Sequence, residues 1–155
     1  MNRKIHIVFY RQEGNLLLYT WCFDGASVNE TDSFFIRFKD NPVYAEDVQI
    51  IVAALKNLGR RGAEDRYLRD EDNASALPIA ASKLRLYCIK GHKYCLLLGG
   101  GGIKSSQRVQ DSPDAYPHFR RMNAVEKSFR KAIAAGDLRW DGDGLIGDFI
   151  LEIDV

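Results

Sequence analysis

Residues 83–110 contain six basic side chains and no acidic one, and this is the part of the sequence best suited to binding an anion. The whole chain is nearly neutral, with a formal net charge of +1. A local excess of cations in a neutral protein predicts a surface for a polyanion, with nucleic acid the first candidate. The alternative is a pair of strands whose lysines only keep their ends solvated. The six cations are Lys83, Arg85, Lys90, Lys93, Lys104 and Arg108.

The spacing within this stretch predicts a β-hairpin with strands at 84–89 and 94–98 and a turn at Gly91-His92. Because side chains alternate across a sheet, Arg85, Tyr87 and Tyr94 are expected on one face. Basic side chains there would contact phosphates and the tyrosines would stack on bases. The alternative is that both tyrosines only cover the outer surface of the sheet.

The other face of this hairpin is predicted to bring Cys88 opposite Cys95, near His92. A zinc site needs a fourth ligand, and no nearby cysteine supplies one, so both are interpreted as buried free thiols. The four glycines of 99–102 allow another chain or a ligand to approach the backbone closely. They do not form a phosphate-binding P-loop, because Ile103 stands where the motif needs glycine. His118, near the start of a helix, is interpreted as a surface residue.

The elements that position these residues are predicted from apolar periodicity. Two helices carry one apolar stripe each, at 42–58 and at 119–135. The segment 34–38 is interpreted as a short strand or as an apolar segment docked beside the first helix. The remaining elements are strands at 4–10, 16–23, 138–140 and 146–153, with a short helix at 63–68. Together they predict an α+β fold in one domain, in which both main helices pack on one face of a mostly antiparallel sheet.

Composition excludes several classes of protein. No apolar run approaches the roughly 18 residues of a membrane helix, and the N-terminus lacks the apolar core of a signal peptide. Three cysteines are an odd number, which argues against a secreted disulfide framework. We therefore expect a soluble cytoplasmic protein with reduced thiols and no membrane partner.

A set of short motifs resembles the RelE/ParE superfamily of bacterial type II toxin–antitoxin modules, in its HigB-like members. They are LRLYCI at 84–89, CLLLGG at 95–100, GIK at 102–104 and DSP at 111–113, followed by a basic amphipathic helix. The resemblance covers roughly residues 34–153 and is specific across about 77–113. It implies a single RelE-like domain over 1–155, with an extra N-terminal hairpin at about 4–23. It also implies a metal-independent mRNA endoribonuclease that acts on RNA or the ribosome and is silenced by an antitoxin protein.

The resemblance assigns roles to individual residues. Arg85, Lys104 and Arg108 would be the catalytic cations that stabilise charge on the phosphorane. No metal or cofactor is expected. The last eight residues lack the terminal tyrosine or histidine of many family ribonucleases, which favours the alternative of a non-catalytic module that binds RNA or an acidic protein partner. The residues expected to bind RNA are Tyr87, Lys90, His92, Lys93 and Tyr94.

Overall fold

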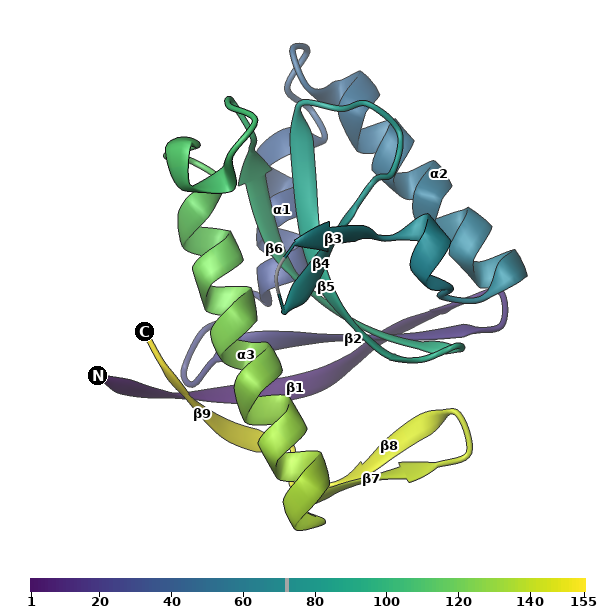
Figure 1. Cartoon of the computed structure of the whole chain (residues 1–155), viewed down its shortest axis with the longest axis vertical. Coiled ribbons are helices and arrows are strands. Elements are labelled where there is room, and N and C mark those ends of the chain that lie inside the picture. The colour runs from purple at the N-terminus through teal and green to yellow at the C-terminus, as the bar shows by residue number, and fades with distance from the viewer. Residues whose placement is uncertain (72) are drawn as a thin grey trace.

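The computed structural model describes residues 1–71 and 73–155, and within them the chain forms a seven-stranded sheet, a two-stranded ribbon and three α-helices (Figure 1). Short 3₁₀ turns lie at Asp65–Tyr67 and Val109–Asp111. The helices are α1 (Glu30–Phe38), α2 (Ala45–Arg61) and α3 (Tyr116–Ala135). The strands are β1 (Asn2–Glu13), β2 (Leu16–Phe23), β3 (Arg69–Glu71), β4 (Ala74–Leu77), β5 (Leu84–His92), β6 (Cys95–Ile103), β7 (Leu138–Asp141), β8 (Gly144–Gly147) and β9 (Ile150–Asp154).

The strand order in the large sheet is β3-β4-β5-β6-β2-β1-β9. Neighbouring strands are antiparallel except β2 and β6, which run parallel and pair Leu17 with Cys95 and Tyr19 with Leu97. The predicted α+β fold with a mostly antiparallel sheet is therefore confirmed. The N-terminal hairpin β1–β2 lies inside this sheet, between β6 and β9, so it is a structural part of the core.

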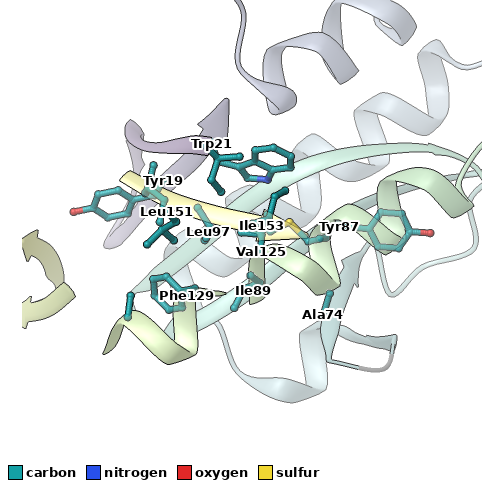
Figure 2. Close-up of a cluster of buried hydrophobic side chains, with 14 of the residues drawn as sticks. Tyr19, Trp21, Ala74, Tyr87, Ile89, Leu97, Val125, Phe129, Leu151 and Ile153 are labelled. Carbon is teal, nitrogen blue, oxygen red and sulfur yellow. The ribbon is translucent and has the colours of Figure 1, made fainter. Parts of the chain in front are cut away.

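The helices cover both faces of the sheet, and the prediction that the two main helices share one face is wrong. Ile51 and Leu55 of α2 pack with Leu86 of β5 in one buried cluster. Phe129 of α3 packs with Ile89 of β5 in a separate one. Figure 2 shows this second cluster, in which α3 side chains meet side chains from the strands. The physical reason is that consecutive residues of β5 and β6 are apolar, so these strands are buried on both sides.

Residues 34–38 form the second half of helix α1. They do not form the short strand that was one of the two predictions for this segment. The Asn29 side chain begins the helix by accepting a hydrogen bond from the backbone N–H of Asp32, at 2.8 Å. Phe34 and Phe38, four residues apart, then bury one face of α1 on the α2 side of the sheet. Thr31 donates a hydrogen bond of 2.9 Å to the carbonyl of Gly99, which fastens α1 to β6.

The β5–β6 hairpin has a different register from the predicted one. Strand β5 continues to His92, which pairs with Cys95, while Cys88 pairs with Leu98. Relative to the predicted pairing of Cys88 with Cys95, strand β6 is displaced by three residues, and an odd displacement puts the side chains of the partner strand on the opposite face. Cys88 therefore lies in the cluster beneath α2, and Cys95 lies in the cluster beneath α3.

The burial of these two thiols makes a testable prediction. Burial raises the pKa of Cys88 and of Cys95 to about 12, so the reactive thiolate is scarce at neutral pH. Iodoacetamide at pH 8 should modify the native protein at Cys22 at most, whereas the unfolded protein should be modified at all three positions. Peptide mass spectrometry reads the sites directly. Rapid native modification of Cys88 would contradict the packing described here.

Candidate nucleic-acid interface

The site residues predicted from the sequence occupy three separate places in the fold. Arg85, Tyr87 and Lys104 lie at the end of the β5–β6 hairpin farther from its turn. A second group surrounds the turn of the hairpin and comprises Lys90, His92, Lys93 and Tyr94. Arg85 and His92 are seven strand residues apart, which corresponds to about 23 Å along the strand. Arg108 lies in the loop before α3 and is exposed.

Arg85 and Tyr87 are inside the protein, so the expected accessible face with these side chains is not formed. Arg85 is 7% exposed, and its guanidinium donates hydrogen bonds to the carbonyls of Ser82 (2.7 Å) and Leu84 (2.8 Å). Burial lowers the pKa of Arg85, although guanidinium stays charged in proteins. Tyr87 is 0% exposed and packs edge-on against Phe119 of α3, which leaves no room for a base to stack on it.

Lys104 is held in an ion pair with Glu71, at 3.7 Å between Nζ and Oε1. The two side chains are only 14% and 12% exposed, and the Glu71 charge also acts on Arg85. A largely buried ion pair is costly to break from one side, because the remaining charge loses its partner. The arrangement is that of a structural ionic cluster at the end of the sheet.

Removing the cation of this cluster should reduce stability. We expect Lys104→Ala to lower the free energy of unfolding by about 1–3 kcal/mol, because Glu71 is left without its partner. Tyr87→Phe is the control in the same cluster. It deletes a buried hydroxyl that has no hydrogen-bond partner among the described residues, so its effect should be within about 1 kcal/mol. Urea denaturation measures both, and a Lys104→Ala variant as stable as the parent would contradict the structural role.

Acids from outside residues 83–110 neutralise most of the cations within it. Lys90 pairs with Asp65 at 3.2 Å, and Lys93 pairs with Glu64 at 3.8 Å. Arg108 lies 3.9 Å from Asp111. The charge segregation seen along the sequence therefore disappears when the 64–71 segment folds beside the hairpin.

His92 is held at the hairpin turn by contacts to the β7–β8 ribbon. Its Nε2 lies 3.0 Å from the carbonyl oxygen of Asp143, and its ring meets the ring of Trp140 edge-on at 4.8 Å. Tyr94 is half-buried, and its backbone N–H donates to Nδ1 of His92. These contacts connect two parts of the fold and present no cationic face.

The outer face of α3 carries a row of exposed cations that we call the α3 ridge, formed by Arg120, Lys127 and Lys131. Spacings of seven and four residues place all three on one side of the helix. None of them forms an ion pair with another described residue, and neither does the neighbouring Arg121.

Helix stability does not explain these charges. Arg120 and Arg121 lie in the second turn of α3, beyond the first turn where the helix dipole acts most strongly, and the first turn has no acidic residue. In α2, by contrast, Arg60 and Arg61 lie in the last turn, where the dipole favours them.

Two hollows follow α3 on the side of the C-terminal strand β9. One has a volume of about 230 Å³ and is lined by Pro117, Arg120, Arg121, Val155 and the acidic Asp154. The other, of about 500 Å³, extends past Lys127 and Lys131 and is also lined by Glu152 and Asp154. The ridge cations thus border a depression along the helix that an extended ligand can follow. The sequence predicted a basic amphipathic helix here, but none of its cations was assigned to the site.

Comparisons with known proteins give no relative: no family model, curated protein or solved structure matches this chain. None of the helices in residues 1–71 and 73–155 is long and apolar enough to cross a membrane.

Proposed function

We propose that this protein binds single-stranded RNA along the α3 ridge. The observation that carries the proposal is the row of exposed cations on α3 without ion-pair partners among the described residues, beside hollows that follow the helix. Phosphates are recognised by such unpaired lysine and arginine side chains.

The composition of the ridge favours a phosphate backbone over an acidic protein partner. Stable protein interfaces are centred on buried aromatic or large apolar side chains surrounded by a polar rim. Between Arg120 and Lys131 the large apolar side chains point into the core, as Met122, Val125 and Phe129 show. The outer face offers charge without an apolar anchor, which suits a polyanion.

The resemblance to the RelE/ParE superfamily extends this proposal to endoribonuclease activity on mRNA and to control by an antitoxin protein. Arg85 is buried and Lys104 is paired with Glu71, so neither is free to contact RNA in the described conformation. Cleavage of bound RNA therefore needs other groups. If no such activity exists, the alternative of a non-catalytic RNA-binding module with the same fold remains.

The test is RNA binding with matched charge reversals. Lys127→Glu/Lys131→Glu should weaken binding of a fluorescent 12-nucleotide RNA more than tenfold and reduce the slope of log affinity against log salt by about 1.4, for two lost phosphate contacts. Lys56→Glu/Arg60→Glu is the control, since these exposed residues have the same spacing on α2, across the sheet. It should bind like the parent.

Two results would contradict the proposal. Equal losses in both double variants would show that binding follows net charge and not the ridge. Tighter binding of poly-glutamate than of RNA would instead identify an acidic protein as the partner.

A further inference from the structure

A small cavity lies where α1, β6 and α3 meet, and it contains side chains suited to proton transfer. Its volume is about 150 Å³, and its lining includes Glu30 and Arg37 of α1, Gly101 of β6, and His118 and Arg121 of α3. Sites for whole small molecules usually measure about 300–1,000 Å³. This cavity admits one small group, such as a phosphate of a longer ligand.

Glu30 and His118 converge over the bare backbone of Gly100. A Cβ atom placed on Gly100 would lie 3.0 Å from Nδ1 of His118 and 3.7 Å from Oε1 of Glu30. The two side chains come from different helices, so the glycine at this position is what allows them to approach one another. The glycine run was predicted to admit close neighbours, as it does here. His118 was interpreted as a surface residue, whereas it lines this cavity.

Neither titratable side chain is satisfied within the described residues. His118 Nδ1 is buried and has no hydrogen-bond partner there, and the Glu30 carboxylate has no hydrogen bond or ion pair there. Buried polar groups usually have partners, and exceptions concentrate where function requires them. Among the described residues, no hydrogen bond therefore holds the Glu30 carboxylate or the His118 ring, and both residues line the cavity.

Two arginines border the cavity, and only one of them is in an ion pair with another described residue. Arg37 is occupied by an ion pair of 2.6 Å with Asp114, whose other oxygen accepts a hydrogen bond from the backbone N–H of Ile103. Arg121 has no ion pair among the described residues and also lines the hollow beside β9. Arg121 thus connects the RNA path along α3 with the cavity.

We propose that this cavity is a phosphodiester-cleaving site, in which Glu30 and His118 exchange protons with RNA while Arg121 contacts the reacting phosphate. The proposal rests on RNA binding along the α3 ridge, which delivers the backbone to Arg121. In this proposal Glu30, His118 and Arg121 act on the substrate in place of Arg85 and Lys104.

The reaction is an intramolecular transesterification and needs no further reactant. One of the two groups takes the proton of the ribose 2′-hydroxyl, and the 2′-oxygen attacks phosphorus. The bond from phosphorus to the 5′-oxygen breaks, and the other group gives a proton to that oxygen. The products are a 2′,3′-cyclic phosphate and a free 5′-hydroxyl. Arg121 stabilises the charge that builds on the phosphate oxygens.

The surroundings of the pair define its pH dependence. Burial raises the pKa of Glu30 above 4.5, against the opposing charges of Arg121 and Arg3. Burial and Arg121, with a further contribution from Arg37, lower the pKa of His118 below 6.5, against the opposing charge of Asp114. Both shifts narrow the pH range in which Glu30 is deprotonated while His118 is protonated. The rate should peak there, falling at higher pH as His118 loses its proton and at lower pH as Glu30 gains one.

The test uses a dinucleotide, uridylyl-adenosine, which is too short to span the α3 ridge. We expect the protein to convert it to a cyclic phosphate product, at a rate that falls at both low and high pH, and to leave the 2′-deoxy analogue intact. Glu30→Gln and His118→Gln should each reduce the rate about 10²–10⁴-fold. Glu30→Gln should also remove the acidic limb of the pH profile and His118→Gln the alkaline limb, which a purely structural role does not explain.

Controls keep the test decisive. Lys56→Glu/Arg60→Glu should cleave the dinucleotide at the parental rate. If a glutamine variant fails to fold by circular dichroism, Gly100→Ala replaces it, since its methyl group would press on His118 Nδ1. Binding of the 12-nucleotide RNA without cleavage of either RNA would overturn this site and leave RNA binding standing. Dinucleotide cleavage without ridge-dependent RNA binding would support the site and overturn the proposed binding path.

Discussion

Gly101→Ala is expected to prevent the sheet from forming or to destabilise it by about 3 kcal/mol or more, at the upper end of overpacking. The reason is a backbone clash, because a Cβ at this position would overlap the carbonyl oxygen of Arg85. That oxygen belongs to β5, the antiparallel neighbour of β6 in the middle of the sheet. Backbone atoms in paired strands cannot move aside without loss of the pairing. Circular dichroism and urea denaturation measure the effect.

The neighbouring glycine is the matched control. Gly100→Ala meets a side chain, His118, at 3.0 Å, so a small shift can relieve the contact. It should fold while losing most of the dinucleotide cleavage. A Gly101→Ala protein with parental stability would show that β5 and β6 are farther apart than described.

Phe129→Ala is expected to lower the free energy of unfolding by about 3–5 kcal/mol, the usual cost of deleting a fully buried aromatic ring. Phe129 is 1% exposed and fills the space between α3 and the strands, as Figure 2 shows. The truncation leaves a cavity that the surrounding side chains fill only in part.

Leu55→Ala probes the opposite face in the same way and should cost about 2–5 kcal/mol. Leu55 belongs to the cluster beneath α2, which shares no residue with that of Phe129. Because the two sites are far apart, the double variant should show additive losses. A strong interaction energy between them would place both helices in one core and contradict the layered fold.

The sequence predicted much of the fold because its local patterns agree with the structure. The spacing of Ile51, Leu55 and Leu58 identified helix α2, and the apolar runs on either side of the Gly91-His92 turn identified two central strands. The glycine run at 99–102 was correctly interpreted as a place of close approach, since each position has a different near neighbour. These are properties of neighbouring residues, which a sequence shows directly.

The predictions that were wrong concern contacts between segments that are distant in the sequence. The β5–β6 hairpin pairs Cys88 with Leu98 in place of Cys95, and this odd shift reversed the expected face for Cys95 and Leu97 of β6. Tyr87 lies on the face opposite Leu86 as predicted, but α3 covers that face. The excess of cations in 83–110 was cancelled by Glu64, Asp65 and Glu71, whose proximity no local pattern indicates. Likewise, nothing local indicates that Glu30 and His118 meet across β6.

The most direct test of the account is to titrate ¹⁵N-labelled protein with single-stranded RNA and follow the backbone amides. RNA binding along the α3 ridge and in the cavity should shift amides along α3 from His118 to Lys131 and at Gly100 and Gly101, and leave the hairpin turn at Lys90–Tyr94 unaffected. Shifts confined to Lys90–Tyr94, with α3 unchanged, would contradict it and return the interface to the hairpin predicted from the sequence.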